Sequence, residues 1–190
     1  MPRIGMEPLR RDALVQATIS EIAATGAIDI TVARIAKRAG MSSALAHHYF
    51  GSKDQMLLAA MRHVLSAFGQ EARKALAVAD TPVTRLEAIV GACFAPLNFQ
   101  SDVVAAWLNF YVQAQRDDET RRLLHIYHAR LRSNLIHALR PLTNRPESLA
   151  EGIGALIDGL YVRQALRKEG LTSAASTRIV LDHIEQGLRR

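Results

Sequence analysis

A single glycine separates two short amphipathic patterns in the stretch TVARIAKRAGMSSALAHHYFGSKD, residues 31–54. Thr31 has the side chain of a helix N-cap, and the apolar residues that follow it recur at helical spacing. These inward-facing positions are Val32, Ile35, Ala36 and Ala39. Gly40 then allows the left-handed conformation that ends a helix. The chain is therefore expected to turn sharply here, after a helix of barely two turns.

A second short helix is expected directly after this turn. Ser42 or Ser43 can cap it, and Ala46 and Phe50 lie one turn apart, where both can face inward. The residues left largely outward are Ser43, Ala44, Leu45, His47 and His48. Two short helices joined by a tight turn predict a helix-turn-helix, whose second helix enters the major groove of DNA. A plain helical hairpin is the alternative.

Three flanking side chains are suited to contact phosphate. Arg34 lies on the first short helix, Tyr49 at the end of the second, and Lys53 at the start of the helix that follows. Phosphate contacts fix the register of a protein on a duplex without reading its sequence. Arg3, Arg10 and Arg11 come before or at the start of the first helix, so they are expected to form an N-terminal arm that reaches DNA.

The rest of the chain predicts helices only. Hydrophobic residues make up 49% and aromatic residues 5%, and β-branched, turn-punctuated stretches are few. We expect an all-α fold of about nine helices, in which residues 1–54 form a helix-turn-helix domain (motif about 31–50) and residues 55–190 a second helical domain. The further helices are expected over 9–24, closed by the glycine of TGAID, and over 52–79, 81–94, 101–115, 117–139, 145–170 and 172–188.

The charge favours a polyanionic partner. The formal net charge is +6 and the isoelectric point about 10.0. Residues 1–53 hold seven basic and four acidic side chains, so the excess is densest at the N-terminus. Nucleic acid, an acidic membrane surface and a merely solvated basic surface all fit this charge. No signal peptide or membrane-length apolar run is present, and a single cysteine excludes an internal disulfide, so a cytoplasmic protein is expected.

Catalytic and metal-binding patterns are not evident. The sequence has no G-x-S-x-G, no Walker loop and no H-E-x-x-H. Cys93 has apolar neighbours and is expected to be a buried, inert thiol. His125 and His128 are three residues apart, but no third ligand is indicated, so both are expected at the surface. We therefore expect no metal, no cofactor and no enzyme, although a small all-α enzyme built on these residues remains one alternative.

The stretch TVARIAKRAGMSSALAHHYFGSKDQML resembles the DNA-binding segment of the TetR family of repressors. The shared positions are Thr31, Ile35, Ala36, Ala39, Gly40, Ser42, Phe50, Ser52, Lys53 and Leu57. The resemblance implies that Ser43, Ala44, Leu45, His47 and His48 lie where the family contacts bases or nearby phosphate. Tyr49 and Lys53 lie where it clamps the backbone, and Arg34 and Ser42 complete the expected DNA-binding set. Ala46 and the pair His47–His48 depart from the common leucine and tyrosines.

Four further segments resemble the BetI type of that family, the choline-responsive repressors of glycine betaine synthesis genes. They are MPRIGME, HYFGSKD, AWLNFY and LIDGLYVRQAL. The resemblance implies a repressor that binds operator DNA as an inverted repeat, pairs as a homodimer through its last two helices and responds to choline. The rival class is a non-specific nucleic-acid-binding protein using the same basic N-terminus.

The apolar stripe of the penultimate helix supports the expected dimer. Ile153, Leu156, Ile157 and Leu160 are accompanied by three glycines, and Val180, Leu181, Ile184 and Leu188 give the last helix a similar face. Core packing accounts for part of this stripe, and we expect a dimer interface to account for the surplus.

A choline site needs aromatic faces, because a quaternary ammonium donates no hydrogen bond. Trp107, Phe110 and Tyr111 lie at i, i+3 and i+4 of one helix, and Tyr127 and Tyr161 lie on later helices. Asp158 is a carboxylate in an apolar run, where it needs a cationic partner, either the ligand or a neighbouring arginine. These six residues form the expected effector site. The alternative is that the aromatic stripe is plain core.

Overall fold

The computed structural model describes residues 5–25, 30–167 and 169–189, and this part of the chain contains nine helices and no strand. The expected all-α fold is confirmed. The helices are α1 (Met6–Thr25), α2 (Val32–Arg38), α3 (Ser43–Phe50), α4 (Lys53–Ala77), α5 (Pro82–Cys93), α6 (Ser101–Ala114), α7 (Asp118–Leu139), α8 (Pro146–Leu166) and α9 (Ser173–Leu188).

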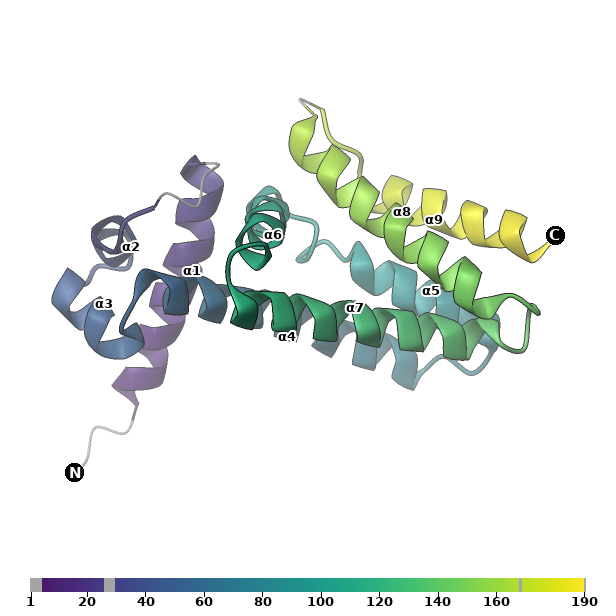
Figure 1. Cartoon of the computed structure of the whole chain (residues 1–190), viewed down its shortest axis with the longest axis horizontal. Coiled ribbons are helices and arrows are strands. Elements are labelled where there is room, and N and C mark those ends of the chain that lie inside the picture. Colours follow the sequence, from purple (N-terminus) through teal and green to yellow (C-terminus); the bar gives the residue numbers. More distant parts are fainter. Residues whose placement is uncertain (1–4, 26–29, 168, 190) are drawn as a thin grey trace.

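The nine helices form an elongated molecule with α1–α3 at one end (Figure 1). The helix α4 leaves this end, and α7 lies beside it along the long axis. The helices α8 and α9 lie toward the other end, where the chain finishes. Between the two ends, α6 packs against α1 on one side and against α7 and α8 on the other. Both α4 and α6 thus connect the N-terminal helices with the larger bundle.

Side-chain caps start the helices where the sequence predicts them. The hydroxyl of Thr31 accepts a hydrogen bond from the Arg34 amide (3.3 Å), and that of Ser52 accepts one from the Gln55 amide (3.2 Å). The choice between Ser42 and Ser43 is settled, because the Ser42 hydroxyl accepts the Leu45 amide at 3.2 Å. The first helix begins three residues earlier than expected, and the glycine of TGAID lies outside the described residues.

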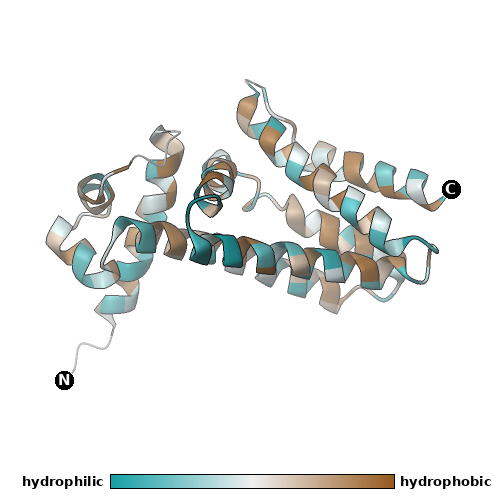
Figure 2. Ribbon diagram, in the orientation of Figure 1, coloured by the Kyte–Doolittle hydropathy of each residue, from teal (hydrophilic) through white to brown (hydrophobic). Residues whose placement is uncertain are grey.

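Two hydrophobic cores hold the chain, and α1 and α4 contribute to both. The smaller core includes Leu14 of α1 and Met56 of α4, and the larger includes Val15 of α1 and Val64 of α4. Figure 2 shows hydrophobic and hydrophilic residues alternating along α7 and α8, as expected of helices with one apolar face. None of the helices in the described part of the chain combines the length and apolarity needed to cross a membrane.

The apolar stripe of α8 faces mostly inward. Ile153 and Ile157 are fully buried and Leu160 is nearly so, all within the chain's own larger core. Core packing, expected to account for part of the stripe, therefore accounts for most of it, and the surplus left for a dimer interface is small. Apolar residues that remain accessible on α8 and α9 include Leu156, Val162, Leu166 and Ile179, and the first two flank Gly159 on α8.

Gly40 and Gly51 have positive φ angles of 66° and 75°, and a Cβ added at either would meet nothing within 4 Å. Replacing Gly40 with alanine therefore adds backbone strain without a clash. We expect Gly40→Ala to lower the free energy of unfolding by about 1–2 kcal/mol, measured by urea denaturation. Gly91→Ala is the control, because Gly91 lies inside α5 with open space around it and gains helix propensity. Equal stability of the two variants would contradict the strain.

Candidate DNA-binding surface and effector site

The outer face of α3 is assembled as the sequence predicts. Ala46 is completely buried and Phe50 half-buried, so these two residues fix the inward side of the helix. Ser43, Ala44, His47 and His48 are exposed, and Leu45 and Tyr49 are half-buried. The resulting outward surface carries two imidazoles and small side chains, which leaves room for close approach to base edges.

The two histidines of α3 differ in their contacts. A ring nitrogen of His47 (Nδ1) lies 2.9 Å from the carbonyl oxygen of Gly51, which caps the end of α3. The His48 ring meets only the edge of Tyr49, with ring centroids 5.4 Å apart. A substitution of His47 therefore disturbs the helix end, whereas His48 can be replaced without removing a hydrogen bond within the chain.

Arg10 and Arg11 lie in the first turns of α1, and their side chains contact the end of α3. Arg11 donates a hydrogen bond to the carbonyl oxygen of Tyr49 (2.5 Å), and its guanidinium lies 4.5 Å from the centre of the Phe50 ring. A cation at the C-terminus of a helix is also favoured by the helix dipole. Arg10 approaches the Tyr49 hydroxyl at 3.5 Å. Arg3 lies outside the described residues.

A buried carboxylate joins α1 to α2. The two oxygens of Glu21 accept hydrogen bonds from the Nε atoms of Arg34 (3.0 Å) and Arg38 (2.5 Å). The Arg38 hydrogen bond, with the positive charges of both arginines, holds the pKa of Glu21 below its ordinary value although burial opposes this. Both ion pairs use the Nε atoms of the arginines, which ties the two guanidinium groups to α1. The sequence analysis did not predict the ion pairs of Glu21 or the role of Arg38. An acidic residue on the buried side of α1 was the signal that could have indicated them, because a buried carboxylate needs a cationic partner.

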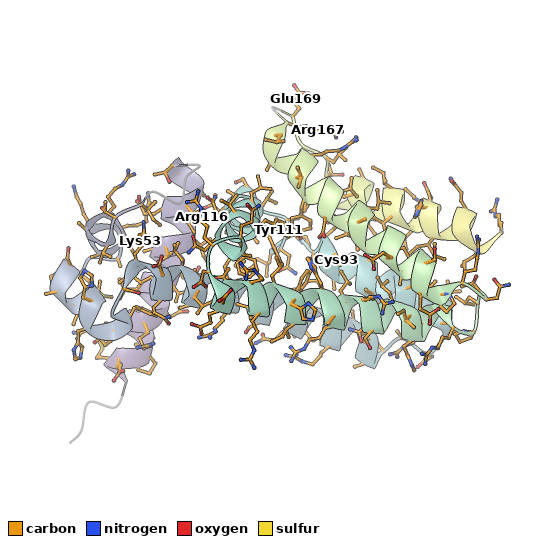
Figure 3. All side chains as sticks on the ribbon, viewed as in Figure 1. Lys53, Cys93, Tyr111, Arg116, Arg167 and Glu169 are labelled. Carbon is orange, nitrogen blue, oxygen red and sulfur yellow. The ribbon has the colours of Figure 1, made fainter. Side chains whose placement is uncertain are left out.

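The DNA-binding and effector candidates lie in different parts of the molecule. Lys53, at the start of α4, and Tyr111, on α6, are well separated in Figure 3. Lys53 follows the capped N-terminus of α4, next to the recognition surface. Lys53 is half-buried, and Arg34 is exposed and bound to Glu21 of α1.

Trp107 lies at the centre of the aromatic cluster. Its ring centroid is 4.8 Å from that of Tyr127, 5.9 Å from Phe110, 6.0 Å from Tyr111 and 6.1 Å from Tyr161. Trp107, Phe110, Tyr127 and Tyr161 are buried, and Tyr111 is half-buried. The structure thus brings all five predicted aromatic residues together. Their rings contact one another, so a ligand placed among them has to separate them.

Asp158 lies at the edge of this cluster, on α8. Its Oδ1 accepts a hydrogen bond from the Tyr111 hydroxyl at 2.9 Å, and its Oδ2 lies 3.5 Å from Nε2 of His128. Of the two expected cationic partners, the ligand or a neighbouring arginine, no arginine pairs with Asp158 among the described residues, and a histidine lies at ion-pairing distance instead. Burial raises the pKa of Asp158, although the Tyr111 hydrogen bond and the His128 charge lower it in part.

The two α7 histidines lie in different environments. His125 is exposed, as expected, but His128 is half-buried between the rings of Tyr111 and Tyr127. The His128 side chain keeps 41% of its surface accessible, so it too lies at the surface, although its ring is packed against aromatic neighbours. Both histidines line a groove between α7 and α8, which Asp158 also lines. No sequence pattern indicates this groove, because α7 and α8 meet only in the tertiary structure.

Tyr161 and Cys93 have structural contacts. The Tyr161 hydroxyl donates to the carbonyl oxygen of Cys93 (2.5 Å) and also lies 3.3 Å from that of Asn98. Cys93 is buried, as expected, and this burial raises the pKa of its thiol to about 12. A thiol at that pKa is protonated near neutral pH, so it is not a nucleophile there. No group of three or more metal-ligating side chains occurs in the described ranges.

Comparison with known families identifies both halves of the chain. Residues 14–60 match the family described as bacterial regulatory proteins of the tetR type, and residues 82–189 match the BetI-type transcriptional repressor C-terminal region. The chain belongs to the TetR family, and its C-terminal region is of the BetI type. A TetR-family protein is a DNA-binding transcriptional regulator. The partner of the basic helix-turn-helix surface is therefore operator DNA.

Full-length relatives agree with this TetR-family assignment. The chain is 50% identical over 186 residues to the HTH-type transcriptional regulator BetI of Brucella anthropi, an alignment that covers 97% of this chain and 96% of the relative. It is 46% identical over 191 residues to the protein of the same name in Rhizobium meliloti, covering 100% and 94%. These relatives are transcriptional regulators and not enzymes.

Solved structures share the TetR-like fold. A putative transcriptional regulator from Pseudomonas aeruginosa PAO1 superposes with a TM-score of 0.82 at 22% identity, over 96% of this chain and 91% of that one. A putative transcriptional regulator from Saccharomonospora viridis, solved in complex with choline, gives a TM-score of 0.82 at 22% identity, over 92% and 95%. At this identity the likeness concerns the fold.

We expect His48→Ala to weaken operator binding by roughly 1–3 kcal/mol, the range for losing one base-contacting side chain. The thermal midpoint should stay nearly unchanged, because the His48 ring is exposed. Fluorescence anisotropy on operator DNA and a thermal melt measure the two effects. His125→Ala, an exposed histidine on α7, is the matched control. A loss of folding in His48→Ala would show that His48 supports the core and not the recognition face.

Proposed function

We propose that this TetR-family protein is a cytoplasmic repressor of choline-to-betaine genes, and that choline releases it from its operator. The observation that carries the choline assignment is the position of Asp158, a part-buried carboxylate beside five clustered aromatic rings. Aromatic faces and a carboxylate are what a quaternary ammonium requires. The BetI-named relatives and the choline-bound structural neighbour support the same ligand.

The proposed DNA contacts are of two kinds: contacts that read the base sequence and contacts that position the protein on the duplex. Outward residues of α3 read base edges in the major groove, and flanking residues contact phosphate. The proposed set is Arg34, Ser42, Ser43, Ala44, Leu45, His47, His48, Tyr49 and Lys53. A two-fold dimer places two such helices about 34–36 Å apart, so the operator is an inverted repeat. Selection from random duplexes distinguishes this function from non-specific binding, which yields no preferred site.

On the effector side, the proposed cage is Trp107, Phe110, Tyr111, Tyr127, Asp158 and Tyr161. Choline enters between rings that contact one another, so the cage opens when the ligand binds. Tyr111 belongs to α6 and Asp158 to α8, and their hydrogen bond closes the cage at one side. A cation that takes the carboxylate competes with this bond and favours a displaced α6.

Displacement of α6 reaches the DNA-binding unit directly, since α6 packs against α1. In turn, α1 holds α2 through Glu21 and contacts the end of α3 through Arg11. The ligand and the operator then favour different positions of the recognition helices. The coupling free energy equals the ligand's differential affinity for the two states, typically ~1–3 kcal/mol.

The homodimer is proposed to form through the accessible faces of α8 and α9. Val162 and Ile179 are large apolar side chains with 38% and 39% exposure, and Leu156 is half-buried. Beside them Gly152 and Gly159 allow close approach of a second helix, and a Cβ on Gly159 would meet nothing within 4 Å in the single chain. These residues replace Ile153 and Ile157, which are buried within the chain, as the core of the proposed interface.

We expect Gly159→Ala to weaken the dimer while stabilising the single chain by up to about 1 kcal/mol through helix propensity. Sedimentation equilibrium measures the dimer dissociation constant. Urea denaturation at protein concentrations below that constant measures the free energy of unfolding of the single chain. Gly91→Ala is the control, since Gly91 has the same open surroundings but lies on α5, which is not a helix of the proposed interface. A dimer unaffected by Gly159→Ala would place the interface elsewhere.

We expect Asp158→Asn to reduce choline affinity at least tenfold, equivalent to about 1.4 kcal/mol, because the ammonium loses its counter-charge. Operator affinity without choline should not change. Calorimetry on the free protein measures the choline affinity, and fluorescence anisotropy on the operator complex measures the operator affinity. Asp182→Asn, which removes an exposed acid of α9, is the control. The proposal fails if choline neither binds nor shifts operator affinity while a neutral or anionic metabolite does both.

A further inference from the structure

His128 occupies the kind of position that an organic cation would take. Its ring is stacked against that of Tyr111, with centroids 6.3 Å apart and planes inclined by 24°, and its other side meets Tyr127 at 5.4 Å. Its Nε2 lies 3.5 Å from Oδ2 of Asp158. Aromatic faces together with a carboxylate are the features that bind a cation, and here a side chain of the protein already fills them.

The Nε2 atom of His128 has no other polar neighbour to satisfy it. It is buried and makes no hydrogen bond of acceptable geometry among the described residues. Asp158 is at ion-pairing distance, and the second oxygen of that carboxylate is engaged by Tyr111. A buried ring nitrogen beside a carboxylate is best satisfied when it carries a proton, because the ion pair then replaces the missing hydrogen bond.

We propose that His128 is the internal cation of the effector site, which pairs with Asp158 as an imidazolium and is displaced when a positively charged effector binds. This inference rests on the proposed choline response and adds its regulation. His128 and Asp158 both line the α7–α8 groove, of about 760 Å³, while Tyr111 and Tyr127 connect them to Trp107. His128 thus stands between the groove and the aromatic cluster, so a ligand entering along the groove meets it first.

Several titratable groups near His128 can be excluded as the source of a pH dependence between pH 5 and 8, which leaves the His128–Asp158 pair. Tyr111 from α6, Tyr127 from α7, Tyr161 from α8 and Cys93 from α5 all have pKa values raised by burial, so they stay neutral between pH 5 and 8. On α7, Arg132 is one turn away and pairs with Glu151 at 3.6 Å. His125, His137 and Arg140 of α7 line the same groove, and Asp158 is the partner itself.

The proposal fixes the sign of the pH dependence. Histidine is the side chain whose charge most readily changes between pH 5 and 8. When His128 is protonated the effector must displace an imidazolium, so choline binds more weakly and its binding releases a proton. As the pH rises the competitor loses its charge, and choline affinity increases between pH 6 and 8. Protonation of Asp158 weakens binding in the same direction, so the two groups need separate tests.

The variant His128→Phe separates the contribution of His128 from that of Asp158, because it keeps an aromatic face and removes the competing charge. Calorimetric titration of the full-length protein with choline, at pH 6 and 8 and in two buffers of different ionisation enthalpy, gives affinity and proton release together. In the variant we expect affinity at pH 6 close to that of the unmodified protein at pH 8, with proton release lost. His128→Gln is the second neutral variant in case phenylalanine overpacks the site. His125→Phe should retain both the pH dependence and the released proton.

The outcomes distinguish this inference from the proposed function. If choline binds the unmodified protein without releasing a proton, no titrating group is coupled to binding. If His128→Phe and His128→Gln keep the original pH profile, Asp158 alone titrates. Either result overturns the inference while choline binding stands. If neither choline nor tetramethylammonium binds the unmodified protein at pH 8, the proposed function fails and the inference fails with it. Proton release in the unmodified protein that both variants abolish supports it.

Discussion

The packing of α6 against α1 on one side and against α7 and α8 on the other is the constraint on which the molecule depends. Trp107 and Phe110 place the buried face of α6 in the larger core, and the Tyr111 hydroxyl binds Asp158 across to α8. The same helix therefore completes the hydrophobic core and one wall of the candidate effector site. A movement that opens the site must also change the contacts with α1, because interiors packed to this density transmit displacement.

Two carboxylates between helices, Glu21 buried and Asp158 half-buried, show how burial and partners decide the role of a charge. Glu21 has two arginines within hydrogen-bonding distance, and its pKa is lowered. Asp158 has a tyrosine hydroxyl and a histidine, and burial raises its pKa. A carboxylate with two permanent cations is fully compensated, so Glu21 holds α1 to α2. A carboxylate whose partner can lose its charge is available to a cationic ligand, which suits the site proposed at Asp158.

Local signals in the sequence were sufficient for the recognition motif. Thr31, Ser42 and Ser52 cap the helices that follow them, because a hydroxyl three residues before an unpaired amide needs no distant partner. Gly40 takes the left-handed turn, and Ala46 faces inward because helical periodicity assigns its side. The five aromatic residues of the candidate site were also found from spacing and scarcity, and the structure brings them together.

What the sequence determined by itself was thus the set of helices, their caps and the outward face of α3, since each depends on residues within about one turn. The tertiary structure decided which residues meet across helices. It placed Arg11 over Phe50, directed Ile153 and Ile157 into the chain's own core, and gave Asp158 a histidine in place of an arginine. These pairs are 30 or more residues apart in sequence or depend on how a helix is rotated about its axis. The packing of all the helices together fixes that rotation, and no local pattern contains it.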